Sequence, residues 1–433
     1  MAREPPDSIG VDSSVRFSIA ATNCTVQYGP DSVRLIQPPV RLSSRVRRRR
    51  CCCELNWLPS DPRSLNQTGN RPRADARFLR VFQYSLMGRR PNVRALPLSE
   101  VDRLGWTTER HGTIVGHWTS EKNFMALDKI ARTRGGLYGL LIGDALGVPY
   151  EFSTPDSLPA RHLIEMSPPD DFSRAHSSVP PGTWSDDGAQ ALVLLDSLLQ
   201  YATLDLRHFT NGLLDWYRYG FMTPDGTVFD IGNQTRYALE NFARHGNPLT
   251  CSPVDDWSNG NGSLMRTLPC ALVGALTPTE VVARARQQSL PTHAHPRSQL
   301  ACALYAVMAW RMVDGEGPVE GLDFAQDFVE STLDPSERSE FFTILDGRLD
   351  PSKGSGYVVD SLWSAIRSVL ATSDYESCVR LAISLGNDTD TTACIAGGLA
   401  GILYGEQGIP DRWRQALKGE VIVEEMLARV TEV

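Results

Sequence analysis

The chain has 433 residues, of which 41% are hydrophobic and 8% aromatic, and its formal net charge is −8. This composition is ordinary for a soluble globular protein, and the length allows two or three average domains or one large helical domain with an extension. The apolar run at 393–404 is shorter than the ~20 residues of a membrane-spanning helix, and the N-terminus lacks the pattern of a secretory signal. We therefore expect a cytoplasmic protein.

Residues 1–124 differ from the rest in charge, with about 20 basic and 11 acidic side chains, or about +9 against −17 in the remainder. Most of the basic residues are arginines, including the run at 47–50, which is followed directly by Cys51, Cys52 and Cys53. No apolar period persists between 38 and 94. We predict a poorly structured Arg-rich extension, with a non-native origin as one interpretation, and favour this over a nucleic-acid or nuclear-targeting patch. The adjacent cysteines lack the two-residue gap of a typical zinc pair.

The character of the sequence changes at Met125, which we expect to lie near the true start of the protein, so that 125–433 form one domain. Apolar stripes of helical period occur at 190–201, 299–313, 358–370 and 378–385, and no long β-type alternation appears. The later cysteines occur singly, as is typical of reduced, buried thiols. The prediction is a compact all-α domain with functional loops.

Two segments are rich in small residues at helical spacing, which favours close contact between helices. Glycine inside a helix costs about 1 kcal/mol relative to alanine, so such clusters indicate tight central packing. The first segment has Gly135, Gly139 and Gly143, and the second has Ala393, Gly397, Ala400 and Gly401. These two helices should be the innermost, each next to an acidic motif.

The first acidic motif is Ser185, Asp186 and Asp187, which by itself has two interpretations. Ser185 can cap a helix whose first turn holds the two aspartates, because exposed N–H groups favour anions there. The alternative is half of a metal site, since carboxylate and hydroxyl oxygens suit Mg²⁺, Mn²⁺ or Ca²⁺.

The second motif, Asp388, Asp390 and Thr391, lies about 200 residues later and changes the balance. It precedes an apolar helix, and clustered carboxylates repel one another unless a cation neutralises them. Together the two motifs can hold two divalent ions roughly 3.5–4 Å apart, as in two-metal hydrolases. Metal binding is therefore favoured over capping.

Glu151 lies between Tyr150 and Phe152, just after the first glycine-rich segment. Partial burial there would raise its pKa into a range useful for acid–base catalysis. A glutamate at the rim of a pocket is an equally good interpretation from these residues alone.

The ordered motifs resemble those of the ADP-ribosylglycohydrolase family, which includes dinitrogenase reductase-activating glycohydrolases and ADP-ribosyl-acceptor hydrolases. The resemblance covers about 300 residues, roughly 127–425, and rests on five blocks in fixed order. It implies a compact all-α fold with a central binuclear Mg²⁺ or Mn²⁺ site. The blocks are 143–152, 182–195, 259–272, 292–301 and 384–408.

The resemblance implies metal ligands at both acidic motifs and an acid–base role for Glu151, with Asp186 as a rival. Ser185 stands where many relatives have threonine but keeps the hydroxyl, whereas Gly188 replaces a threonine and so removes a side chain. The implied ligands are Ser185, Asp186, Asp187, Asp388, Asp390 and Thr391.

The resemblance also implies a pyrophosphate loop, for which glycines and a following helix N-terminus are suitable. His293 resembles the family's histidine at a helix start and is expected to contact substrate, whereas His295 has no assigned role. The other implied substrate-binding residues are Asn259, Gly260, Asn261, Gly262, Ser263, Met265 and Arg266.

The expected reaction is metal-dependent cleavage of the glycosidic bond between ADP-ribose and an acceptor, either a protein side chain or a small molecule. A nucleic acid is expected only as a possible acceptor, and a monomer is expected. One alternative is a non-catalytic ADP-ribose-binding or crystallin-like protein of the same fold. Another is a two-metal nucleotide phosphohydrolase, which would release a different product.

Overall fold

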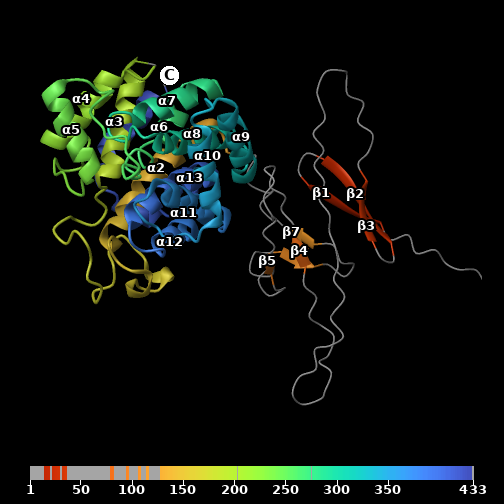
Figure 1. Cartoon of the computed structure of the whole chain (residues 1–433). Helices are drawn as coiled ribbons and strands as arrows, with labels where there is room; N and C mark the ends of the chain where they lie inside the picture. The colour runs from red at the N-terminus through yellow and green to blue at the C-terminus, as the bar shows by residue number, and fades with distance from the viewer. Residues whose placement is uncertain are drawn as a thin grey trace, which may run out of the picture. The chain divides into compact units, whose positions relative to one another are not determined.

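The computed structural model describes residues 127–431, apart from Ala202 and Ala275, and the backbone of short strands within the first 116 residues. Contacts divide the chain into two units, Met1–Thr119 and Ser120–Val433. Figure 1 shows the helical unit and the separate strands. The expected boundary near residue 125 lies close to this division.

The first unit contains antiparallel strand pairs. The Arg run at 47–50 and the three adjacent cysteines lie outside the described residues, so the expectation of a poorly structured extension stays a prediction. A sheet is formed by β1 (Ser14–Ile19), β2 (Thr22–Gly29) and β3 (Ser32–Ile36), while β4 (Leu79–Val81) pairs with β5 (Arg94–Leu96) and β6 (Trp106–Thr108) pairs with β7 (Ile114–Gly116).

The second unit confirms the all-α prediction, because its described residues form helices and the one strand-type pairing among them is an isolated bridge between Gly260 and Tyr357. Each predicted apolar stripe falls on a helix. The helices are α2 (Lys129–Gly147), α3 (Asp186–Tyr201), α4 (Leu206–Tyr219), α5 (Asn233–His245), α6 (Pro269–Leu272), α7 (Pro278–Ser289), α8 (Pro296–Val313), α9 (Pro318–Ser331), α10 (Arg338–Asp346), α11 (Val358–Leu370), α12 (Tyr375–Ile383), α13 (Thr389–Tyr404), α14 (Asp411–Ala416) and α15 (Glu420–Thr431). Short 3₁₀ turns η3 (Val148–Tyr150), η4 (Pro155–Ser157), η5 (Arg161–Leu163), η6 (Gly347–Leu349) and η7 (Glu406–Gly408) join them.

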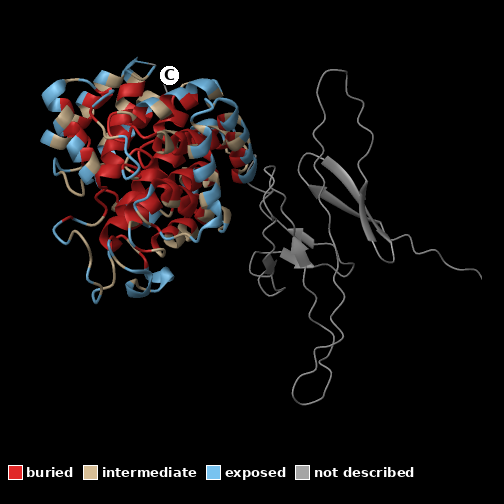
Figure 2. Cartoon of the chain, viewed as in Figure 1, coloured by how far each residue is buried: buried red, intermediate tan, exposed pale blue. Residues whose placement is uncertain are grey.

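Helices α2 and α13 form the centre of the unit, as the glycine pattern predicted. Residues 135–147 of α2 and 389–403 of α13 are all buried, and Figure 2 shows the buried interior beneath an exposed outer surface. A Cβ atom on Gly139 would clash with the carbonyl oxygen of Gly397, and one on Gly397 would clash with that of Gly139. The two backbones therefore touch directly.

This contact brings the acidic motifs together. Helix α2 ends where Pro149 follows Val148 in η3, and the chain then turns into Glu151. Helix α13 begins directly after Asp388. Because the two helices touch along their length, the exit of α2 and the entry of α13 lie side by side. Among the described helices, none is both long and apolar enough to cross a membrane.

Candidate metal centre and substrate cavity

The first acidic motif lies at the start of α3, and capping is part of its structure. The Ser185 hydroxyl accepts the N–H of Asp187 at 3.2 Å. Asp144, a buried residue of α2, accepts the N–H of Ser185 at 3.0 Å and that of Gly188 at 2.8 Å. The exposed N–H groups at the helix start are thus satisfied from within the protein, and the carboxylates of Asp186 and Asp187 do not serve as caps.

Gly188 has no room for a side chain. A Cβ atom there would lie 2.7 Å from Leu141 Cδ2 and 2.8 Å from Trp184 Cγ. The backbone N–H of this glycine keeps its bond to Asp144. The close packing of α2 against the start of α3 therefore leaves no space for a threonine at this position.

The second motif starts α13 and contacts the first. Asp388 precedes the helix, and the Thr391 hydroxyl donates to Asp187 Oδ1 at 3.3 Å. Asp390 is fully buried, and neither of its carboxylate oxygens has a hydrogen-bond partner; Asp187 Oδ2 is also buried without one. Buried carboxylate oxygens without partners are costly unless a cation or proton neutralises them.

Glu151 is held beside the second motif by backbone pairing. The N–H of Phe152 donates to the carbonyl of Asn387 at 2.7 Å, and the N–H of Asn387 donates to that of Ser153 at 2.7 Å. Both Phe152 and Asn387 have positive φ angles, 61° and 62°. Strained residues of this kind persist where surrounding contacts fix them. As a result, carboxylate oxygens of Glu151, Asp388 and Asp390 lie within 4.8 Å of one another.

These groups surround a cavity of about 300 Å³, where most of the predicted site residues meet. Its lining contains residues from both acidic motifs, the glycine loop and the start of α5. The lining residues from the prediction are Glu151, Asp186, Asp187, Gly260, Asn261, Gly262, Met265, His293, Asp388 and Thr391. Ser185, Asn259, Ser263, Arg266 and Asp390 are not part of that lining, although Asp390 belongs to the carboxylate group beside it.

The glycine loop is tied to the second acidic motif. The Asn261 amide donates to Asp388 Oδ2 at 2.8 Å, and its backbone N–H donates to Gly356 at 3.1 Å. A Cβ on Gly262 would lie 2.7 Å from His293 Cε1. Glycine at 262 therefore lets the imidazole of His293 pack closely against the loop. The loop forms one wall of the cavity, and His293 also lines it.

Arg266 does not reach the cavity, which corrects the expectation of direct substrate contact. Its side chain is fully buried and donates to Gln190, Gln288 and Thr292 at 2.7–2.9 Å. Gln190 in turn donates to Asp186 Oδ2 at 2.9 Å. Arg266 thus orients Asp186 through Gln190.

Two other predicted loop residues also make internal contacts. The Ser263 hydroxyl accepts from Ser289 at 2.9 Å in a fully buried position, and the Asn259 amide donates to the Asp256 carbonyl at 3.0 Å. His295, which had no assigned role, caps α8 by accepting the N–H of Arg297. These residues shape the loop and the helix behind it.

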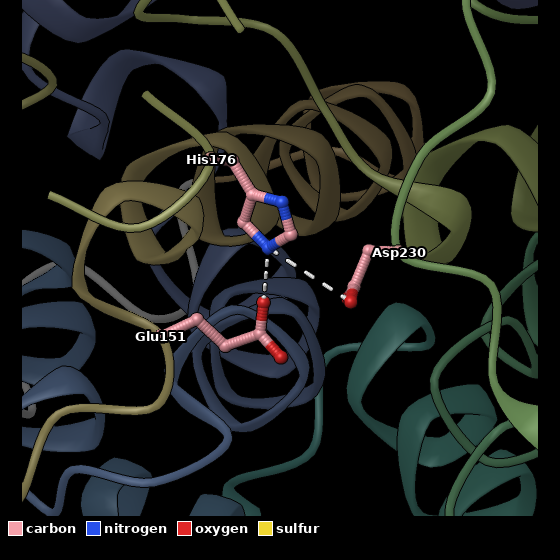
Figure 3. Close-up of side chains that lie close together, drawn as sticks. All are labelled: Glu151, His176 and Asp230. Atoms are coloured by element: carbon pink, nitrogen blue, oxygen red, sulfur yellow. Dashed lines mark hydrogen bonds and ion pairs between the residues drawn. The ribbon is translucent and has the colours of Figure 1, made fainter. Parts of the chain in front are cut away.

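Sequence reasoning missed two residues beside Glu151, His176 and Asp230, which Figure 3 shows with it. His176 Nε2 lies 2.7 Å from Glu151 Oε2 and 3.8 Å from Asp230 Oδ1. Each comes from a loop as a single ionisable residue without neighbours of its kind. Asp144 lay inside a quoted motif, but its role as the cap of another helix depends on how α2 and α3 pack.

Burial and mutual repulsion make so many carboxylate charges unfavourable in this site. Burial, with Asp230 and Asp388, raises the pKa of Glu151 to about 10, and burial raises the pKa of Asp144 and of Asp230 to about 7. The pKa values of Asp186, Asp187 and Asp390 are raised for the same reason, burial first and neighbouring carboxylates second. His293 behaves in the opposite way, because burial lowers its pKa to about 3 and keeps it neutral.

The donor set fits divalent cations. Three buried carboxylate oxygens lack partners, and the surrounding groups are carboxylates with one threonine hydroxyl. Hard oxygen donors of this kind suit Mg²⁺ and Mn²⁺, and a cation at this point would remove the repulsion that raises the pKa values.

Comparisons with known proteins identify the family. The family model described as ADP-ribosylglycohydrolase matches residues 125–433. A protein of Pseudomonas putida, ADP-ribosylarginine hydrolase Tri1, is 33% identical over 331 residues, which cover 74% of this chain and 81% of that protein. The ADP-ribosyl-[dinitrogen reductase] glycohydrolase of Rhodospirillum rubrum is 28% identical over 292 residues, covering 67% and 91%.

A solved structure gives the same result. It is described as an ADP-ribosylglycohydrolase-related protein complex and is 31% identical in sequence with a TM-score of 0.58, covering 70% of this chain and 98% of that one. The helical fold, the paired acidic motifs and these matches lead to one conclusion. The chain belongs to the ADP-ribosylglycohydrolase family.

Proposed function

We propose that the chain hydrolyses the N-glycosidic bond between ADP-ribose and an arginine side chain, with two divalent cations, Mg²⁺ or Mn²⁺. The observation that carries the proposal is the meeting of two acidic helix starts and Glu151 in one cavity beside a glycine loop. Removal of ADP-ribose from an acceptor is the activity that the names of the relatives share.

The acidic motifs are the proposed cation site. Asp187 and Asp390 would bind through the oxygens that lack partners, and Asp186, Asp388 and Thr391 would complete the set. Ser185 remains a candidate through the lone pair that its capping bond leaves free. When bound, the cations supply Lewis acidity that neutralises the carboxylates and polarises oxygen ligands.

The protein's own residues bind and orient the substrate. Gly260 and Gly262 offer a wall without side chains, which suits the close approach of a diphosphate, and Met265 and His293 lie beside them. Asn261 is fixed by Asp388, so the diphosphate wall and the carboxylates keep a constant separation. A diphosphate bound at this wall would therefore hold the ribose and its glycosidic bond in a constant position relative to the carboxylates.

Glu151 is the proposed acid–base residue. Its carboxyl group lines the cavity, and burial is the main reason that its pKa is raised to about 10. Asp186, in contrast, is fixed by a hydrogen bond from the Gln190 amide. A carboxyl group like that of Glu151 can deliver a proton to the departing group, and nearby carboxylates stabilise positive charge on the ribose. Asp186 and Asp230 are the rival carboxylates.

Charge supports an arginine acceptor. Asp230 lines the cavity outside the proposed cation site, and a guanidinium is the cationic, planar acceptor that pairs best with a carboxylate. Two of the similar proteins, from Serratia proteamaculans and Pseudomonas putida, are named ADP-ribosylarginine hydrolases. A serine acceptor offers no charge for this lining to recognise.

The test is product analysis on two matched peptides, one ADP-ribosylated on arginine and one on serine, with Mg²⁺, Mn²⁺ or chelator. We expect ADP-ribose and unmodified arginine peptide, formed by the native protein and lost in Asp187→Ala and Asp390→Ala but not in the exposed control Asp215→Ala. Release of phosphate or AMP would identify a phosphohydrolase. Binding of ADP-ribose without any release would identify a non-catalytic protein.

A further inference from the structure

We propose that His176 is a positioning residue that holds the Glu151 carboxylate in its working orientation, an inference that rests on the proposed function. The contact that carries it is the 2.7 Å hydrogen bond between His176 Nε2 and Glu151 Oε2. His176 comes from the loop before α3, so a segment separate from the acidic motifs controls the acid–base residue.

The loop is built to present this histidine. The N–H of Ala175 donates to the carbonyl of Pro149 at 2.9 Å, which anchors the loop to η3 just before Glu151. The Arg174 guanidinium donates to the carbonyls of His176 and Val179, and the N–H of Val179 donates to the His176 carbonyl at 2.8 Å. His176 itself has a φ of 47°, a strained value for a residue with a side chain.

Aromatic rings fix the plane of the imidazole. Its centroid lies 5.7 Å from that of Phe152 and 5.2 Å from that of Phe229, with interplanar angles of 49° and 54°. These two phenylalanines are the chain neighbours of Glu151 and Asp230. The ring is therefore clamped by residues attached to the same two carboxylates that it faces.

One imidazole nitrogen bonds to Glu151 and also faces Asp230. His176 Nε2 lies 2.7 Å from Glu151 Oε2 and 3.8 Å from Asp230 Oδ1 (Figure 3). In this view the second oxygen of Glu151 points away from the imidazole. That arrangement leaves one oxygen for His176 and the other for the reaction, and the Glu151 carboxylate lies close to those of Asp388 and Asp390.

The consequence of losing this bond is a misplaced Glu151 and not an unfolded protein. Only 6% of the Glu151 side chain and 17% of the His176 side chain are exposed, so bulk water does not readily replace the imidazole as a partner of the carboxylate. Without the imidazole, the Glu151 carboxyl group would lose the hydrogen bond that fixes its orientation toward the reacting bond. Catalytic turnover would fall while the glycine loop, and hence substrate affinity, stays unchanged.

Two substitutions separate the hydrogen bond from the ring packing. His176→Phe keeps an aromatic ring between Phe152 and Phe229 but has no polar atom, whereas His176→Gln loses the ring but keeps a polar amide at the same reach. We expect His176→Phe to lower kcat about 10- to 100-fold with KM and thermal midpoint unchanged. His176→Gln should recover a large part of that loss.

A double-mutant cycle with Glu151→Gln tests whether His176 acts through Glu151, because a residue that acts through another has no further effect once that partner is altered. The expected result is that His176→Phe lowers kcat in the native background and not in Glu151→Gln. If the native protein is active and His176→Phe has the same kcat, the inference is overturned and the proposed function stays intact. So would a loss in His176→Phe that His176→Gln does not recover. Absence of ADP-ribose release from the native protein would instead refute the proposed function, and the inference with it.

Discussion

Asp144 accepts the backbone N–H of Ser185 through both of its carboxylate oxygens, each at 3.0 Å. A residue in the interior of α2 thus caps α3, and it frees the carboxylates of the first acidic motif from capping. Because α2 also touches α13, one central helix positions both acidic motifs. The geometry of the site is therefore set by the packing of three helices more than by the loops between them.

Replacing Asp144 with alanine should loosen the first motif. The N–H groups of Ser185 and Gly188 would lose their acceptor, which costs about 1–3 kcal/mol for a buried group. At pH 6 little charge repulsion is relieved in return, since the pKa of Asp144 is raised to about 7 and the group is mostly protonated. Urea unfolding at pH 6 should show this loss, and the exposed control Asp215→Ala should not. Equal stability of the two variants would contradict the capping role.

The metal-free protein should become less stable as the pH rises from 6.5 to 9. The folded-state pKa values of Asp144 and Asp230 are about 7 and that of Glu151 is about 10, all above their unfolded values near 4. The folded state therefore holds protons that the unfolded state has released, and stability falls with pH through this window. His176 and His293, whose pKa values are lowered by burial, act in the opposite direction only up to about pH 7.5, because the unfolded imidazole is half protonated near pH 6.5.

Thermal midpoints in chelator across this pH range provide the measurement. Saturating Mn²⁺ should reduce the fall, because a bound cation takes the place of the protons. A midpoint that rises with pH in chelator would show that the carboxylates are not as buried together as the structure has them.

Asp390→Asn should have opposite effects on stability and on metal affinity. In chelator at pH 8 the variant should melt at a higher temperature than the native protein, because a buried carboxylate without partners has been made neutral. The stabilisation that Mn²⁺ gives should shrink strongly at the same time. Paired melting curves with and without Mn²⁺ measure both effects, and an unchanged response to Mn²⁺ would remove Asp390 from the cation site.

Gly139→Ala should destabilise the domain by about 1–3 kcal/mol, the usual cost of forcing an extra carbon into a packed core. Its Cβ would meet the carbonyl oxygen of Gly397 on α13, which is backbone and cannot rotate away. Gly321→Ala on α9 is a helical comparison with a much milder contact, because its Cβ would lie 3.2 Å from the nearest atom, Met308 O, and alanine favours a helix. Chemical unfolding should separate the two, and similar values would refute the close contact of α2 and α13.

Much of the helical core could be predicted from local pattern. The stripe at 358–370 coincides with α11, and the repeats of Gly139 and Gly397 predicted the innermost helix pair because only small side chains let backbones touch. The acidic motifs were found for a similar reason. Several oxygen donors close together in sequence stay close together in any fold.

The rest of the site depends on contacts between distant segments. His176 and Asp230 are single residues in loops, and nothing in their neighbourhood indicates that the fold brings both to Glu151. Arg266 was expected to bind substrate because its segment resembles the family's pyrophosphate loop, but its side chain points inward to Gln190 and Gln288. A loop motif predicts which residues lie near the site. The packing of the whole domain decides which of their side chains face the cavity.

The most direct test of the account is the release of ADP-ribose from an arginine-ADP-ribosylated peptide by the full chain, measured after chelation and again after Mn²⁺ is added back. The account predicts that release stops in chelator and returns with Mn²⁺ in the native protein, and that Asp390→Asn stays inactive in both conditions. Release that continues in chelator at the native rate would contradict a metal-dependent hydrolase built on the two acidic motifs.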